Sequence, residues 1–137
     1  MIISDPSFCK LYENENFILG HVYEKGYLID KKNNDATYIA DFYGDPSCGV
    51  ISKRGDWCVV GGDKLIVWKR LTKAELIKEE VLTPVFGIKY LSENEVKVLV
   101  DPWSEKGAIW LLNTETLERN KIADYKLNNE YTEKFNW

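Results

Sequence analysis

His21 is the only histidine of the chain and the first residue to consider as a catalytic base. It lies in the segment 17–23, where Phe17, Leu19, His21 and Tyr23 would share one face of a strand. A serine nucleophile needs a neighbouring base and an oxyanion hole, and the sequence has neither a second histidine nor a Gly-x-Ser-x-Gly motif. We therefore expect a structural role for His21 and no acyl-transfer chemistry.

Paired carboxylates are the second kind of candidate. Glu79 with Glu80, and Asp101 with Glu105, could supply the acid and the base of a glycosidase. Such pairs are also common on the solvated surface of any acidic protein, and this is the reading we prefer. A carboxylate-dependent glycosidase or lyase that uses Asp101, Glu105 or His21 stays open as the enzymatic alternative, but we expect a protein that is not an enzyme.

The sequence gives little support to a phosphate, metal or redox site. No phosphate-cradling glycine motif is present, and the Gly-Gly-Asp segment 61–63 is typical of a hairpin turn. Calcium loops of the Asp-x-Asp type are missing as well. Cys9, Cys48 and Cys58 lack Cys-x-x-Cys spacing and lie among strand-like apolar residues, where reduced cysteines act as small hydrophobic groups. We expect no metal and no cofactor.

Composition favours one all-β domain. The length of 137 residues suits a single domain, and the aromatic content of 13% favours strands. The first residues do not form a secretory signal, and no apolar run approaches the ~20 residues that cross a bilayer, so we expect a cytoplasmic protein without a membrane partner. A net charge of -4 disfavours nucleic-acid binding and suits a basic protein partner.

A repeat of about forty residues organises the chain. The segment Asp5-Pro6-Ser7 recurs as Asp45-Pro46-Ser47, and more loosely as Thr-Pro-Val-Phe at 83–86. We place the repeats at 5–44, 45–82 and 83–127, with a C-terminal cap at 128–137.

Each repeat is predicted to hold four antiparallel strands. The first two form a hairpin with a polar turn, and the third is a continuous apolar run, typical of a strand that is covered on both faces. The fourth is more polar, as an edge strand tolerates. The predicted strands are 8–12, 17–23, 27–29 and 37–43; 48–52, 57–60, 64–68 and 76–82; and 85–91, 96–100, 108–112 and 121–127. Good helix formers at 71–80 leave a short helix there as the alternative.

Four antiparallel strands in about forty residues resemble a β-propeller blade. The segments 61–68 and 107–116 are similar to the inner hairpins of tryptophan-aspartate repeat propellers. Three blades are fewer than the four to eight of an ordinary closed ring. The array could dimerise into a six-bladed ring, curl into a compact prism, which we favour, or use the residues 131–137 as a cap.

The propeller resemblance implies that one face of the molecule gathers the loops after the second and fourth strands. That face would be acidic and aromatic, as protein interfaces often are, unless Tyr43 and Trp103 pack beneath their own loops. The expected partner-binding residues are Tyr23, Glu24, Tyr43, Asp45, Asp63, Asp101, Trp103 and Glu105.

We therefore expect a protein-binding module. In size and character the chain looks like the small bacterial immunity proteins of polymorphic toxin systems, which implies neutralisation of a basic nuclease-type toxin domain by binding it. The alternative is a structural or assembly subunit that forms a homodimeric, propeller-like ring, with Trp57, Trp68 and Trp110 driving self-association.

Overall fold

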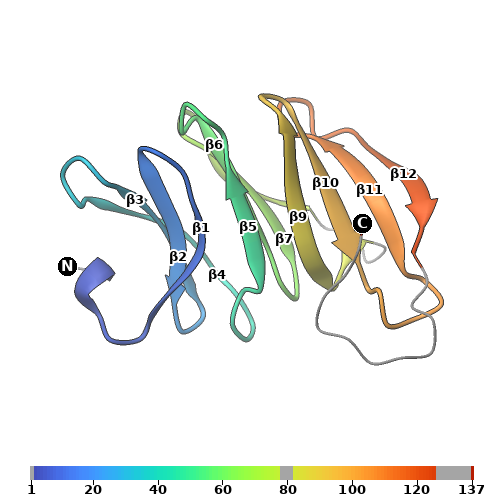
Figure 1. Ribbon diagram of the computed structural model, residues 1–137, viewed down its shortest axis with the longest axis horizontal. Coiled ribbons are helices and arrows are strands. Elements are labelled where there is room, and N and C mark those ends of the chain that lie inside the picture. Colours follow the sequence, from blue (N-terminus) through green and yellow to red (C-terminus); the bar gives the residue numbers. More distant parts are fainter. Residues whose placement is uncertain (1, 78–81, 126–136) are drawn as a thin grey trace.

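Three four-stranded antiparallel sheets lie side by side along the chain (Figure 1). The computed structural model describes residues 2–77, 82–125 and 137. In each sheet the strands follow one another in sequence order. The all-β, blade-like prediction is confirmed. The strands of blade 1 are β1 (Phe8–Glu13), β2 (Phe17–Val22), β3 (Lys25–Asp30) and β4 (Ala36–Asp41); those of blade 2 are β5 (Cys48–Ile51), β6 (Trp57–Gly61), β7 (Leu65–Lys69) and β8 (Lys73–Ile77); those of blade 3 are β9 (Val85–Ser92), β10 (Glu95–Val100), β11 (Ala108–Asn113) and β12 (Arg119–Asp124). A short 3-10 helix, η1 (Ile2–Ser4), precedes blade 1.

Blade 2 is covered on both faces, as its continuous apolar strands predicted. In β6, Cys58 and Val60 pack towards blade 1, whereas Trp57 and Val59 pack towards blade 3. The strand β7 repeats the alternation, with Ile66 and Trp68 on the blade 1 side and Leu65 and Val67 on the blade 3 side. Side chains alternate between the two faces of a strand, so one apolar run fills two cores at once.

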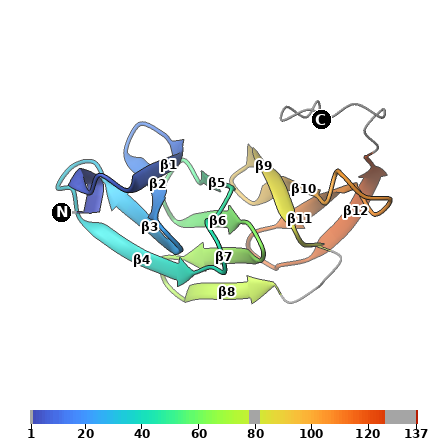
Figure 2. The same ribbon diagram turned by 90° about the horizontal axis from the view of Figure 1, so that it is seen from below.

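The first strand of each blade lies next to the first strand of the neighbouring blade. Strand β5 contacts both β1 and β9, and Figure 2 shows the other strands following outwards to β4 and β8. Blades 1 and 3 lie on opposite sides of blade 2 in both views. The three sheets therefore form an open row, and the compact prism that we favoured is wrong.

The two end faces of this row differ. On the far side of blade 3 the Trp137 ring packs against Gly87, and the ammonium groups of Lys89 and Lys97 lie 4.5 and 5.8 Å from the ring centroid. The rest of the predicted cap, 128–136, lies outside the described residues. On the far side of blade 1 the rings of Tyr27 and Tyr38 meet edge to face at 6.0 Å, and Tyr38 remains 50% exposed.

Two details of the strand prediction need correction. The third strand of blade 1, predicted at 27–29, already begins at Lys25: Val22 pairs with Lys25, which leaves Tyr23 and Glu24 as a two-residue turn. The last strand of blade 2 spans Lys73–Ile77 where we predicted 76–82 or a helix, and residues 78–81 lie outside the described part. This segment pairs with β7, with Lys73 opposite Lys69, and the pairing overrides its helix propensity.

Candidate protein-interaction surface

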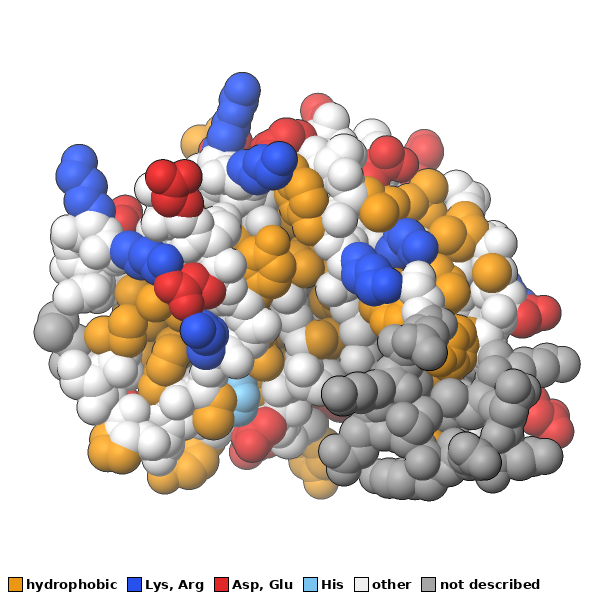
Figure 3. Space-filling view, in the orientation of Figure 1, with side chains coloured by type: hydrophobic (Ala, Val, Ile, Leu, Met, Phe, Trp, Pro, Cys, Tyr) orange, Lys and Arg blue, Asp and Glu red, His pale blue; other side chains and the backbone are white. Residues whose placement is uncertain are grey.

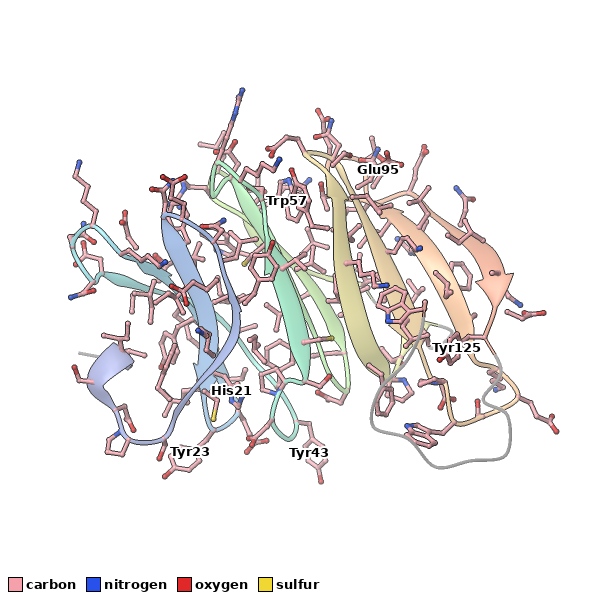
Figure 4. All side chains as sticks on the ribbon, in the orientation of Figure 1. His21, Tyr23, Tyr43, Trp57, Glu95 and Tyr125 are labelled. Carbon is pink, nitrogen blue, oxygen red and sulfur yellow. The ribbon has the colours of Figure 1, made fainter. Side chains whose placement is uncertain are left out.

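The predicted binding residues lie on loops at one end of the three blades. These loops are the β2–β3 turn, the β4–β5 linker, the β6–β7 turn and the β10–β11 loop, all at the lower end in Figure 1. We call this the acidic end; it comprises Tyr23, Glu24, Tyr43, Asp45, Asp63, Asp101, Trp103 and Glu105. The labelled side chains of Tyr23 and Tyr43 point outwards from it (Figure 4).

Tyr23 stands at the first position of the β2–β3 turn with a φ of 51°. This left-handed conformation is uncommon for an aromatic residue and is usually left to glycine. The carbonyl oxygen of Tyr23 lies 2.8 Å from Nδ1 of the buried His21, and its hydroxyl accepts a hydrogen bond from Ser7 Oγ at 3.0 Å. Tyr23 is nevertheless 69% exposed. His21 thus has a structural contact that holds an exposed tyrosine in place.

The β4–β5 linker presents a second exposed tyrosine. Phe42 is buried at the interface of blades 1 and 2, while the next residue, Tyr43, is 87% exposed. The Tyr43 amide donates to Asp63 Oδ1 at 3.2 Å, and the Gly44 amide donates to Glu24 Oε2 at 2.6 Å. Two carboxylates therefore fix the backbone on either side of the Tyr43 ring. Contrary to the alternative that we considered, Tyr43 does not pack beneath its loop.

The remainder of the linker is fastened to blades 2 and 3. Ser47 Oγ donates to the Val85 carbonyl at 2.9 Å, and the Ser47 amide donates to the Gly61 carbonyl at 2.8 Å. In the first repeat, the Ser7 amide donates to Asp5 Oδ1 at 2.8 Å. The repeated Asp-Pro-Ser motif thus closes loops in two different ways. The Asp45 side chain is exposed beside this anchored segment.

The third part of the acidic end belongs to blade 3. Asp101 has a φ of 44°, and its carboxylate accepts a hydrogen bond from Ser104 Oγ at 2.7 Å. Glu105 is exposed in the same loop, and Trp103 is 41% exposed. The hydrogen bonds given above join Asp63 to the Tyr43 amide and Glu24 to the Gly44 amide, whereas Asp101 closes its own loop. The structure therefore brings together one group on blades 1 and 2 and a second on blade 3.

The structure also bears on the other candidate sites that were considered from the sequence. Glu79 and Glu80 lie outside the described residues. Among residues 2–77, 82–125 and 137, no group of three or more His, Cys, Asp or Glu side chains is arranged to hold a metal ion. No helix in this part of the chain is long and apolar enough to cross a membrane. Cys58 is buried and Cys48 half-buried, but Cys9 is exposed, which corrects the expectation that all three act as packed hydrophobic groups.

A groove of about 770 Å³, which was not predicted from the sequence, lies between blades 2 and 3 at the opposite end. Trp57 lines it, together with three basic side chains, Arg54, Lys69 and Arg70, and three acidic ones, Asp56, Glu93 and Glu115. The adjacent basic pairs 53–54, between β5 and β6, and 69–70, at the end of β7, are the sequence signal that could have indicated it. Figure 3 shows Lys and Arg side chains standing out at this upper end over blades 1 and 2, with acidic side chains among them and over blade 3.

The sequence matches no protein-family model and no curated protein. Its structure is similar to the β-propeller domain of Cps50 (Swd1) from Myceliophteria thermophila, with a TM-score of 0.60 and 12% sequence identity. The chain has a β-propeller-like fold. The match covers 85% of this chain and 38% of that one, so the chain spans well under half of the propeller that it resembles. At this identity the likeness establishes the fold alone, and a function has to be argued from the surface.

Proposed function

We propose that the chain is a protein-binding module that uses its acidic end to bind a basic protein. The observation that carries the proposal is the exposure of Tyr43, at 87%, on a backbone that the carboxylates of Glu24 and Asp63 hold in place. Aromatic side chains supply buried area in an interface, and surrounding carboxylates steer a basic partner. A loop that is already ordered loses less conformational entropy when it binds.

The specific form that we propose is an immunity protein that neutralises a basic nuclease-type toxin domain in the bacterial cytoplasm. The net charge of -4 supports a basic partner. Carboxylates on such a binder would cover the cationic surface with which a nuclease holds phosphates. In this proposal the protein acts by occupying the toxin surface and catalyses no reaction.

The test is coexpression of the chain with the genes that flank its own, followed by affinity capture and a toxicity assay of each captured protein alone. The triple variant Tyr43→Ser, Asp45→Lys, Glu105→Lys changes three exposed side chains at the acidic end and should lose both capture and protection. Each exposed charge reversal at an interface of this kind should slow association, so we expect an affinity at least ~10-fold lower.

The matched control is the double variant Asp35→Lys, Glu118→Lys, which reverses two exposed carboxylates in loops at the opposite end. It should capture and protect as well as the unmodified chain. Equal loss in both variants would show that net charge matters and the acidic end does not. Protection by a folded triple variant would reject the acidic end as the binding surface.

The far face of blade 1 supports a second candidate, a subunit of a homodimeric ring. Tyr38 is half exposed there, and its hydroxyl donates to Asp41 Oδ1 at 2.7 Å beside Lys25. Lys25 Nζ donates to the same oxygen at 3.1 Å. The hydrogen bonds from Tyr38 and Lys25 lower the pKa of Asp41, so its carboxylate stays charged beside the Lys25 ammonium group. In a six-bladed ring this face would meet blade 3 of the second copy.

The mass in solution separates the two candidates. A stable dimer that Tyr38→Lys converts to a monomer would favour the ring, because obligate interfaces are large and mostly apolar. A monomer at about 100 μM, well above the Kd of most obligate dimers, would reject the ring and leave the binding module.

A further inference from the structure

The far face of blade 3 holds an aromatic ring in a seat made by two strands. Gly87 in β9 pairs with Leu99 in β10, and two residues further along the same strands Lys89 pairs with Lys97. The missing side chain at Gly87 leaves room for the Trp137 ring, since a Cβ there would lie 2.7 Å from the ring carbon Cζ2. We call Gly87, Lys89 and Lys97 the ring seat.

The two lysines of the ring seat contact both the ring and the backbone of its occupant. Their ammonium groups, 4.5 and 5.8 Å from the ring centroid, are within the range of a cation–π interaction. Lys97 Nζ also donates to the Trp137 carbonyl oxygen at 3.3 Å. Trp137 itself is only half-buried. The seat therefore recognises an electron-rich ring with an oxygen acceptor beside it, and it is open to solvent.

The pairing of Lys89 with Lys97 is unfavourable in the absence of a ligand. Like charges directly opposite each other on neighbouring strands destabilise a sheet. Neither lysine forms an ion pair with a carboxylate side chain of the described residues. Apolar side chains would hold an indole ring without this repulsion. The lysine pair therefore indicates a surface for binding and not one for stability alone.

The charges of this face favour an acidic segment around the ring. Alternation along β10 puts Glu95 on the same face as Lys97, at the upper end of the sheet (Figure 4). It is the only carboxylate in the strands β9 to β11. The row through Gly87 continues into Leu99 and Ile109, which are 0% and 9% exposed and lie outside the apolar cluster shared with blade 2. The centre of the face thus has two positive charges beside an apolar row.

We propose that the ring seat is a second binding site of the protein, for an aromatic side chain in an acidic segment of a partner protein, and that Trp137 competes with this partner. The aromatic ring of the partner lies over Gly87, and carboxylates next to it neutralise Lys89 and Lys97. Tyr38 of a second copy suits the seat less well, because Lys25 beside its ring would meet the same two ammonium groups.

The variant Trp137→Ala opens the seat and makes the competition measurable. The probe is a fluorescent ten-residue peptide with a central tryptophan flanked by glutamates, titrated by anisotropy. We expect saturable binding, with a Kd at least ~10-fold lower for Trp137→Ala than for the unmodified chain, since a competing occupied state reduces the apparent affinity. Two control probes, one with alanine for the tryptophan and one with lysines for the glutamates, should bind at least ~10-fold more weakly than the acidic tryptophan probe.

Substitutions in the Trp137→Ala background test the individual residues of the seat. Gly87→Val fills the space of the ring and should abolish saturable binding; the three atoms nearest to a Cβ at this position all belong to Trp137, so the side chain has room without it. Lys89→Gln and Lys97→Gln should each raise the Kd ~3-fold, the size of a cation–π contact at an exposed site. Lys106→Gln is the matched control, because it removes the same charge from an exposed side chain at the acidic end and should leave the Kd within ~2-fold.

Stability separates a binding role of the lysines from a structural one. In the Trp137→Ala background, Lys89→Gln removes the repulsion from Lys97 and should leave the urea midpoint unchanged or higher. A lower midpoint would show that the lysine stabilises the fold and would overturn the proposal. So would equal affinities of Trp137→Ala and the unmodified chain, or no saturable binding up to ~1 mM, about the weakest measurable affinity. A Trp137→Ala dimer that Tyr38→Lys converts to a monomer would assign the face to a second copy and reject the partner segment.

The ring seat shares no residue with the acidic end, so the two proposals fail separately. The triple variant of the acidic end, combined with Trp137→Ala, should still bind the acidic tryptophan probe. Gly87→Val in the Trp137→Ala background should still capture the basic partner.

Discussion

The indole Nε1 of Trp57 donates a 2.6 Å hydrogen bond to the carbonyl oxygen of Glu93. This bond joins β6 of blade 2 to the turn between β9 and β10 of blade 3, and the two blades also share the apolar cluster around Val59 and Val98. Trp57 is thus both a core residue and a polar link between repeats. A propeller-like row depends on such links because each blade contacts only its neighbours.

Trp57→Phe should destabilise the fold by ~1–3 kcal/mol, since it removes the bond to Glu93 and some of the packed volume. Urea unfolding monitored by circular dichroism measures this change. Tyr43→Phe is the control, and loss of its exposed hydroxyl should change stability by less than ~0.5 kcal/mol. Equal urea midpoints for the unmodified chain and Trp57→Phe would mean that the hydrogen bond between Trp57 and Glu93 contributes nothing to stability.

Gly55 and Gly44 form a matched pair. Both have positive φ, at 72° and 81°, so alanine is strained at either position. A Cβ at Gly55 would overlap the Phe17 ring, whereas a Cβ at Gly44 would meet nothing within 4 Å. Gly44→Ala should therefore lower the free energy of unfolding by ~1 kcal/mol, through backbone strain alone. Gly55→Ala should lower it by ~2–4 kcal/mol, because overpacking against Phe17 adds to the strain. The free energy of unfolding of both variants measures the difference, and equal costs would contradict the contact with Phe17.

Glu13 should make stability sensitive to acid. Hydrogen bonds from Lys10, at 2.8 Å, and from Lys31 lower the pKa of its carboxyl from 4.5 to about 2. Because the folded pKa is the lower one, the stabilisation is complete above pH 4.5 and is lost as the pH falls towards 2. An NMR titration of the Glu13 side chain measures this pKa directly.

The variant Glu13→Gln should lose less stability than the unmodified chain over the same acid range. Glu15→Gln, which changes an exposed neighbour in the same turn, should lose as much as the unmodified chain does. Identical pH profiles for all three proteins would reject the role of Glu13.

The three cysteines should differ in reactivity. Cys9 is exposed on β1, whereas burial raises the pKa of the Cys48 thiol to about 12 and also raises that of Cys58. The thiolate is the reactive form, so a thiol reagent at pH 8 should label Cys9 in the folded protein, and the other two only after unfolding. Cys9→Ser should abolish labelling of the folded chain. Rapid labelling of Cys58 in that variant would contradict its burial.

Much of the fold could be predicted from the sequence because blade 2 is apolar at every position that a two-sided strand needs. The continuous apolar run at β7 indicated cover on both faces, and the structure places Ile66 and Val67 in different cores. The repeated motif at 5–7 and 45–47 gave the spacing of the blades. These features are local, since strand periodicity and turn residues depend on near neighbours in the chain.

The open arrangement of the three blades and the position of β8 were decided by tertiary structure. The residues at 71–80 favour a helix by propensity, but β7 offers a paired edge that holds Lys73–Ile77 as a strand. The arrangement of blades 1 and 3 on opposite sides of blade 2 depends on contacts between residues that are distant in sequence. No local pattern contains that information.

For the two candidate surfaces, too, the sequence determined one part and the tertiary structure the other. The sequence alone determined which loops are acidic and aromatic, because strand order assigns Tyr23, Tyr43 and Asp101 to one end. Only the tertiary structure showed that Glu24 and Asp63 anchor the Tyr43 backbone, and that the Trp137 ring lies against Gly87, Lys89 and Lys97. The physical reason is that composition and periodicity fix the face on which a side chain lies, whereas hydrogen bonds and ring contacts between distant segments arise only when those segments pack together.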